Sequence, residues 1–251
     1  MKIGIMDSGL GGLTVLKECL YRLPAHEYLY YADSNNAPYG TKSKEDVYKL
    51  TKTAVDYLIE KEADIIVIAC NTATAASAAQ LREIYDIPII GMEPAIKPAL
   101  LSASNKRVLV TATELTLREK KFRNLIATLD ICNQVDKVSL NELVTFAEAG
   151  NFCRNTIISF LTDALANFNL ELYGSIVLGC THFPLFKEYF EEIFPVGTVI
   201  VDGAVGTTNR VKEFVTSDSK TPSTKFFLSG VPLIEGELFD RMKHIVEMDI
   251  K

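Results

Sequence analysis

The sequence predicts an α/β fold with largely parallel sheets. Short runs rich in Ile and Val alternate along the chain with longer segments in which apolar residues recur at helical spacing. The run IIVIA at 65–69 is apolar throughout, which is typical of a strand buried on both faces of a parallel sheet. At 251 residues, 48% hydrophobic and 23% charged, the chain is large enough for one big domain or two small ones.

The elements follow in a regular order. We expect a strand at 2–7, a helix at 13–23, a strand at 27–33, a helix from about 44 to 61 and a strand at 64–69. Further strands are predicted at 87–91, 107–112, 137–140, 175–179 and 198–203, each separated from the next by a segment with helical spacing. Ligands of such sheets bind where strands end and loops lead into helices, so functional residues are expected at those ends.

Composition narrows the function classes. The net charge of -6 and pI near 5.2 provide no broad basic surface for nucleic acid or an anionic membrane. No apolar run reaches about 18 residues, and the start of the chain has the pattern of a strand, not of a signal peptide, which predicts a cytoplasmic protein. The cysteines are odd in number and scattered, which indicates free thiols in a reducing compartment: Cys19, Cys70, Cys132, Cys153 and Cys180.

Two segments run from a strand into a cysteine and then into polar residues. In VIACNTAT (67–74), Cys70 ends the strand, and Asn71 or Thr72 is expected to cap the next helix. In IVLGCTHF (176–183), Cys180 has the same place, and Pro184 suits the first turn of the element that follows. Each thiol should therefore lie beside a helix N-terminus, which lowers a thiol pKa.

A cysteine after an apolar strand is more often a small buried hydrophobe than a nucleophile. Two in matching positions, one of them with His182 two residues later, favour a pair of reactive thiols. The repetition also predicts two similar lobes, with a break near 92–98. His26 and His244 have no polar neighbours of this kind and are expected to be surface or structural residues.

Other strand ends carry polar side chains. MDSGLGG (6–12) has neither the dinucleotide-binding nor the P-loop spacing, but its glycines offer backbone N–H groups to an anion. Asp7 can pair with an ammonium group or accept a proton from a thiol, and it can equally be a turn residue. Thr113 and Thr116 offer hydroxyls at a further strand end, or cap a helix. The pattern around Glu148, taken alone, favours a solvated carboxylate at the end of a helix.

The segments GIMDSGLGGLTVL, APYGTKS, IACNTATA and LGCTHFPL, in this order, closely resemble the glutamate racemases, cofactor-independent amino-acid racemases of bacterial cell-wall synthesis. The similarity extends from about residue 2 to about 202. It implies two α/β lobes related by pseudo-twofold symmetry, with the active site in the cleft between them. On this basis, the first lobe is expected to comprise residues 1–94 and 207–251, and the second lobe residues 95–206.

The resemblance also implies roles for individual residues. Cys70 and Cys180 match the two catalytic bases, and Asp7, His182 and Glu148 match the acid and base groups that support them. The positions that match substrate-holding residues are Asp7, Ser8, Tyr39, Gly40, Asn71, Thr72, Thr113, Thr116 and Thr181. The segment after Thr113 departs from the usual family pattern, and so do Phe146 and Ala147 before Glu148.

Two sulfurs on opposite faces of an amino acid explain an inversion that needs neither metal nor pyridoxal phosphate. By resemblance, Cys180 removes the α-proton of L-glutamate and Cys70 removes that of D-glutamate. The resemblance also implies a homodimer, the usual oligomeric state of the family. Glu93 and Pro94 fit the glutamate branch better than the aspartate branch. The alternatives are an aspartate racemase, a zinc hydrolase with Cys70, Cys180 and His182 as ligands, and a small-molecule binding module without chemistry.

Overall fold

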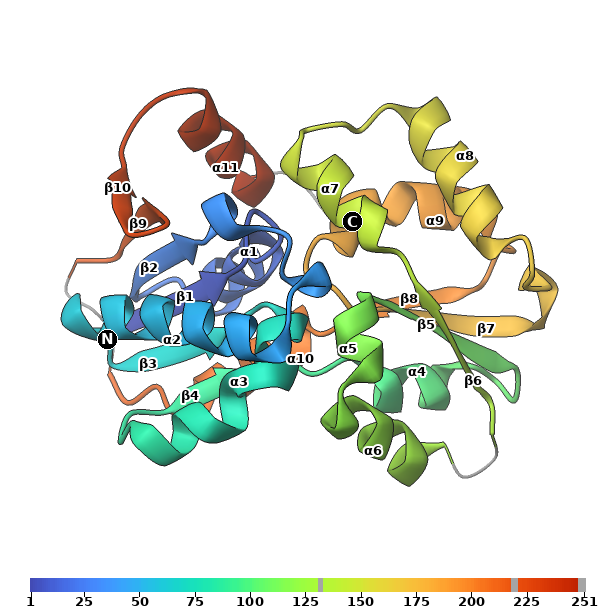
Figure 1. Ribbon diagram of the computed structural model, residues 1–251, viewed down its shortest axis with the longest axis horizontal. Coiled ribbons are helices and arrows are strands. Elements are labelled where there is room, and N and C mark those ends of the chain that lie inside the picture. The colour runs from blue at the N-terminus through green and yellow to red at the C-terminus, as the bar shows by residue number, and fades with distance from the viewer. Residues whose placement is uncertain (131–132, 218–220, 248–251) are drawn as a thin grey trace.

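The computed structural model describes residues 1–130, 133–217 and 221–247. It contains two β-sheets side by side, each covered by helices, as Figure 1 shows. The predicted α/β class is therefore confirmed. Within the described residues, no helix is long and apolar enough to cross a membrane.

The first lobe is built on a six-stranded sheet with the order β10-β9-β2-β1-β3-β4. All neighbouring strands in it are parallel except the β9–β10 hairpin. Its elements are β1 (Lys2–Asp7), α1 (Leu13–Arg22), β2 (Glu27–Ala32), α2 (Lys44–Glu60), β3 (Ile65–Ile68), α3 (Asn71–Ile84), β4 (Ile89–Gly91), α10 (Ala204–Lys212), β9 (Ser223–Leu228), β10 (Val231–Leu233) and α11 (Glu237–Glu247).

The second lobe is built on a four-stranded parallel sheet with the order β6-β5-β7-β8. Its elements are α4 (Ile96–Ser102), β5 (Arg107–Ala112), α5 (Glu114–Arg118), α6 (Lys120–Leu129), β6 (Val135–Ser139), α7 (Asn141–Glu148), α8 (Arg154–Leu165), β7 (Tyr173–Leu178), α9 (Lys187–Ile193) and β8 (Val199–Asp202). The strands lie within a few residues of the predicted ranges.

The two sheets share one strand order. The core β2-β1-β3-β4 of the first lobe has the same arrangement as β6-β5-β7-β8 of the second. Strand β3 therefore corresponds to β7, and the cysteine-bearing loops leave both sheets at equivalent places. This duplication is the pseudo-symmetry that the sequence predicts.

The central strands of each sheet, β1 and β3 in the first and β5 and β7 in the second, are buried on both faces. Along β3, Ile65 and Val67 pack against α1, whereas Ile66 and Ile68 pack against α2 and α3. This alternation explains why the strand is apolar at every position. The chain returns to the first lobe after β8, because Ala204 and Val211 of α10 join the core around α1. The predicted boundary at 206/207 falls within α10, and the lobe boundaries stay a prediction.

The hairpin of β9 and β10 was not among the predicted strands. It turns at Ser229 and Gly230, both of which have positive φ, as tight hairpin turns require. It extends the first sheet beyond β2 and leads the chain to α11, which packs on α1 through Met242 and Ile245.

Candidate active site

Cys70 lies between β3 and α3 and is itself the N-cap of the helix. Its sulfur accepts a hydrogen bond from the backbone N–H of Ala73 at 3.4 Å, so the expected capping by Asn71 or Thr72 is wrong. The thiol donates to the hydroxyl of Ser8, 3.5 Å away at the end of β1. The side chain is 5% exposed. Cys70 is thus a buried thiol that meets the positive end of a helix.

The expected lowering of the Cys70 pKa is also wrong. Burial, and to a smaller extent the nearby Asp7 carboxylate and Cys180, raise the pKa of this thiol to about 12, which outweighs the opposing effect of its hydrogen bonds with Ala73 and Ser8. Desolvation acts on the whole charge of a thiolate, whereas the helix end and single hydrogen bonds compensate only part of it. Without a bound cation, Cys70 is a protonated thiol at neutral pH.

Cys180 has a different neighbourhood. It follows β7, and its sulfur lies 3.8 Å from Nδ1 of His182. Pro184 stands in the first turn of the short helix Phe183–Phe186, as predicted. Nε2 of His182 lies 2.6 Å from Oε1 of Glu148. Burial lowers the pKa of His182, but Cys180 and Glu148 outweigh it and hold that pKa well above its ordinary value. The side chains of Cys180, His182 and Glu148 thus form a hydrogen-bonded chain.

Glu148 ends α7 and reaches across to the first lobe. Its Oε1 accepts the backbone N–H of Leu10 at 2.6 Å, and Ser34 donates to Oε2 at 3.4 Å. Its side chain is 19% exposed, so the interpretation as a solvated helix-end carboxylate is wrong. The glycines of the 6–12 loop make room for this contact, since a Cβ at Gly9 would collide with the Glu148 carboxylate.

Asp7 connects the two lobes at the end of β1. Its Oδ1 accepts the N–H of Gly9, and its Oδ2 accepts the Thr181 hydroxyl, each at 3.0 Å. Burial raises the pKa of Asp7 to about 6, although His182 and the two hydrogen bonds oppose the shift. A buried carboxylate with a raised pKa is suited to receive an ammonium group or a proton.

Three threonine hydroxyls from both lobes form a buried triangle. Thr72 lies 2.8 Å from Thr113 and 3.1 Å from Thr116, and Thr113 lies 2.9 Å from Thr116. Thr113 also caps α5, which confirms that interpretation of its hydroxyl, whereas a role in substrate binding stays a prediction. Gly40 packs against it so closely that a Cβ there would come within 2.8 Å of the Thr113 Cβ.

Two further predicted residues differ in their availability. The side-chain amide of Asn71 is buried and makes no hydrogen bond to any described residue, so its donor and acceptor groups are free for a substrate. The phenol of Tyr39 instead donates to Asp33 at 2.6 Å, although its ring shares a hydrophobic cluster with Cys70. His26 is buried and His244 exposed, and neither joins the site. Cys132 lies outside the described residues.

The arrangement does not fit a metal centre. Among residues 1–130, 133–217 and 221–247, no group of three or more His, Cys, Asp or Glu side chains is placed to hold a metal ion. The four described cysteines are free thiols. The geometry therefore does not support the zinc hydrolase alternative, whereas two thiols with separate acid and base neighbours suit proton transfer.

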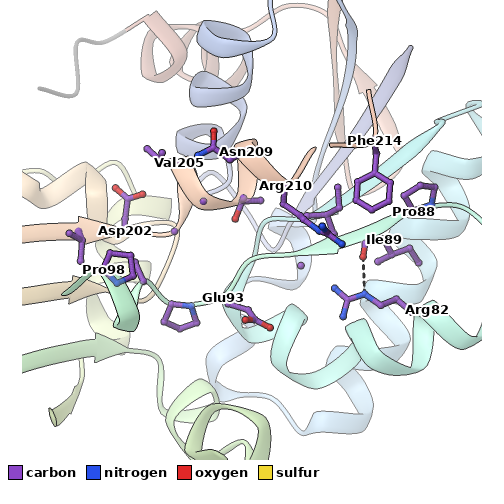
Figure 2. A pocket seen from close by; sticks show the side chains of 18 of the residues that line it. Arg82, Pro88, Ile89, Glu93, Pro98, Asp202, Val205, Asn209, Arg210 and Phe214 are labelled. Atoms are coloured by element: carbon purple, nitrogen blue, oxygen red, sulfur yellow. Dashed lines mark hydrogen bonds between the residues drawn. The ribbon is translucent and has the colours of Figure 1, made fainter. Parts of the chain in front are cut away.

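A groove of about 1390 Å³ lies away from the cysteines and contains none of the predicted site residues. Figure 2 shows it between β4, residues 93–95, the first turn of α4, β8 and α10. The arginines at its wall have partners within the protein: Arg82 donates to the Ile89 carbonyl at 2.8 Å, and Arg210 stacks on Phe214. This groove is not the site of the cysteine chemistry.

Sequence reasoning missed several residues of the site. Leu10 contributes only its backbone N–H, Ser34 its hydroxyl, and Arg241 two hydrogen bonds to the end of α7. The glycines flanking Leu10 were the one usable signal, because they indicate exposed N–H groups. Ser34 and Arg241 stand alone among residues that form no recognisable motif, so the sequence gives no signal for them.

Known proteins are similar to this chain over most of its length. The sequence model of the Asp/Glu/hydantoin racemase family matches residues 3–209. The glutamate racemase of Halothermothrix orenii is 48% identical over 236 residues, covering 92% of this chain and 93% of that protein. Glutamate racemase 2 of Bacillus subtilis is 43% identical, with coverages of 99% and 96%.

Solved structures agree. Escherichia coli glutamate racemase, in complex with L-glutamate and the activator UDP-MurNAc-ala, superposes with a TM-score of 0.80 at 31% identity, covering 88% of this chain and 86% of that one. The Francisella tularensis enzyme with D-glutamate gives 0.84 at 25% identity, with coverages of 100% and 95%. This chain therefore belongs to the Asp/Glu/hydantoin racemase family, among the glutamate racemases, and is an isomerase of the amino-acid racemase class.

Proposed function

We propose that this protein interconverts L- and D-glutamate by passing the α-proton between two thiols, Cys70 and Cys180. The observation that carries the proposal is the placement of these sulfurs. They follow equivalent strands of the two lobes, both are buried, and Cys180 lies near enough to raise the pKa of Cys70.

Inversion at the α-carbon requires a base on one face and an acid on the other. In this proposal Cys180 removes the proton of L-glutamate while Cys70 donates one to the opposite face, and the roles exchange for D-glutamate. His182 and Glu148 share the proton of Cys180. Asp7 serves Cys70, whose pKa it influences most strongly after burial.

The raised pKa of Cys70 fits a base that forms only with substrate in place. An α-ammonium group near Asp7 would add a positive charge to a site in which burial and the neighbouring carboxylates disfavour further negative charge. That charge stabilises the Cys70 thiolate and the Asp7 carboxylate together. The thiol then becomes reactive where and when the substrate is present.

Neutral donors are available for the two carboxylates of glutamate. The proposed contacts come from the free amide of Asn71, from the backbone of the 6–12 loop and from five hydroxyl groups, those of Ser8, Thr72, Thr113, Thr116 and Thr181. Tyr39 and Gly40 are proposed to lie beside them. Hydrogen bonds from neutral groups hold a carboxylate without the tight ground-state ion pair that would slow turnover.

Glutamate is favoured over aspartate as substrate because the curated relatives at 43–48% identity are named glutamate racemases, and two of the similar structures were solved with L- or D-glutamate. The proposal extends to a homodimer in the cytoplasm that supplies D-glutamate for peptidoglycan. It requires no cofactor.

The test follows optical rotation with L-glutamate and L-aspartate side by side, using enzyme dialysed against EDTA and kept reduced. We expect loss of rotation with glutamate at the same rate as in undialysed enzyme. Faster racemisation of aspartate would reassign the substrate. Loss of activity to EDTA that zinc restores would replace the two-thiol mechanism, and no exchange of the α-proton of either amino acid would indicate a binding module.

A further inference from the structure

Arg241 of α11 contacts the end of α7 across the two lobes. Its Nη2 donates to the backbone carbonyls of Ala147 at 3.0 Å and of Glu148 at 2.6 Å. Its helix belongs to the first lobe, since Met242 and Ile245 pack in the core around α1. Figure 1 shows α11 and α7 next to each other at the junction of the lobes.

This contact satisfies a need of α7. The last carbonyls of a helix have no partner within it, and its C-terminal end is partly negative. The last turn of α7 contains no basic residue of its own. The Arg241 guanidinium supplies both the donors and the positive charge. Gly150, with φ of +69°, turns the chain there, and a Cβ at this position would come within 2.8 Å of Arg241 Nη1.

Glu148 is therefore held by the first lobe at both of its ends. Its carboxylate accepts from Leu10, and its backbone carbonyl accepts from Arg241. Between these two contacts the carboxylate keeps its 2.6 Å hydrogen bond with His182, the neighbour of Cys180. Movement of α7 away from α11 would break the contacts with Leu10 and Arg241, and with them the support that holds the Glu148 carboxylate at His182.

We propose that Arg241 is a positioning residue for proton transfer at Cys180, a role that rests on the proposed function. It fixes the end of α7 against the first lobe, so that Glu148 stays within hydrogen-bond reach of His182 when the lobes are together. The C-terminal helix thereby contributes to one of the two proton-transfer faces.

The positive charge of Arg241 supports the same role as its hydrogen bonds. Burial raises the pKa of Glu148, but the hydrogen bond and charge of His182, the Leu10 N–H and the charge of Arg241 together bring it below its ordinary value. Arg241 thus helps Glu148 to remain a carboxylate that can hold the His182 proton. Cys70 has no such dependence, because its hydrogen-bond partners are Ser8 and Ala73 of the first lobe.

A double-mutant cycle tests this coupling through Glu148. We expect Arg241→Gln to lower kcat/KM for glutamate about 10-fold, and Arg241→Lys, which keeps the charge, to recover part of that loss. In a Glu148→Gln background, Arg241→Gln should change kcat/KM by less than about 2-fold, because the two residues act through one contact. Lys243→Gln, an exposed change on the same helix, should match the wild type.

The cycle overturns the inference if the two losses multiply in the double variant, or if Arg241→Gln is as active as Lys243→Gln. A second measurement separates positioning from a general loosening of the lobes. The rates at which iodoacetamide labels Cys70 and Cys180 are followed by mass spectrometry between pH 6 and 10, without substrate. We expect Arg241→Gln to shift the pH profile of Cys180 and to leave the labelling rates of Cys70, whose pKa lies above this pH range, unchanged.

Equal changes at both cysteines would show only looser lobes and would overturn the positioning role. The labelling does not depend on turnover, so it also separates the two proposals. If the wild-type protein fails to racemise glutamate but the pH profile of Cys180 labelling still shifts in Arg241→Gln, the proposed substrate is wrong and the positioning role is supported. If the wild type racemises glutamate but Arg241→Gln causes no selective shift at Cys180, the proposed function is supported and the positioning role is wrong.

Discussion

Cys70 and Cys180 each lie two residues beyond the end of a strand, and the two strands, β3 ending at Ile68 and β7 ending at Leu178, are equivalent in the duplicated sheet order. Their partners are nevertheless different. Cys70 meets a helix N–H and a serine hydroxyl, whereas Cys180 meets an imidazole that is bound to a carboxylate. The fold is symmetric and the chemistry around the sulfurs is not, so the two directions of the reaction should respond differently to mutation.

Replacing His182 with Asn removes the proton-sharing partner of Cys180 alone. We expect kcat to fall by about 100-fold in at least one direction, within the range of lost general acid–base catalysis. Since the equilibrium between enantiomers is fixed, kcat/KM must fall equally in both directions, and unequal changes in kcat must be offset in KM. Initial rates from each enantiomer measure this, with His244→Asn as the exposed control. Equal changes in every constant would indicate that His182 only shapes the pocket.

Replacing Asp7 with Asn should stabilise the protein at pH 8 while abolishing activity. Burial raises the pKa of Asp7 to about 6, so the folded state binds a proton more tightly than the unfolded chain. Its contribution to folding is therefore most favourable below about pH 4, and it is lost as pH rises through 6. The amide can still accept from Gly9 and donate to the Thr181 hydroxyl, and it carries no charge.

The gain in the free energy of unfolding should reach up to about 3 kcal/mol at pH 8, the value of a shift of roughly two pKa units, and should vanish near pH 4. Urea unfolding of both proteins at these two pH values measures it. A variant that is less stable than the wild type at pH 8 would show that the Asp7 charge is compensated by its neighbours.

Replacing Thr116 with Val removes one hydroxyl from the buried triangle. We expect KM for glutamate to rise about 10-fold with a smaller change in kcat, because a binding donor is lost and the sulfurs are untouched. Steady-state kinetics with both enantiomers measure the split. Thr128→Val is the matched control, since the Thr128 hydroxyl only bonds back to Asn124 in its own helix. A fall in kcat at constant KM would place the triangle in the chemical step.

Much of the fold could be predicted because it depends on local patterns. A buried strand such as 65–68 needs apolar residues on both faces, and the sequence shows this pattern directly. The place of Cys70 and Cys180 at strand ends followed directly, and helix capping was one of the two interpretations given for Thr113. The N-cap of α3 was the local feature predicted wrongly, because Cys70 itself caps that helix.

What the sequence left unpredicted depends on contacts between distant segments. Glu148 reaches Cys180's neighbour only because Leu10 and His182 come to it from elsewhere in the chain, so its local pattern indicated a solvated carboxylate and only the family resemblance predicted a role for it. The pKa of Cys70 is set by burial, which overrides the local effect of the helix end. Arg241 acts through its side chain on backbone carbonyls 93 and 94 residues away, a contact that leaves no pattern in the sequence.

The two sulfurs themselves are tested by single replacements, Cys70→Ala and Cys180→Ala, with the exposed Cys153→Ala as control. Interconversion of glutamate enantiomers and deuterium uptake at the α-carbon are followed together in deuterium oxide. We predict that each active-site variant loses inversion in both directions by about 10³-fold or more, because inversion always needs both faces. Any residual label should enter D-glutamate in Cys180→Ala and L-glutamate in Cys70→Ala, while Cys153→Ala inverts normally. Inversion at a near wild-type rate by either active-site variant would contradict the two-thiol account.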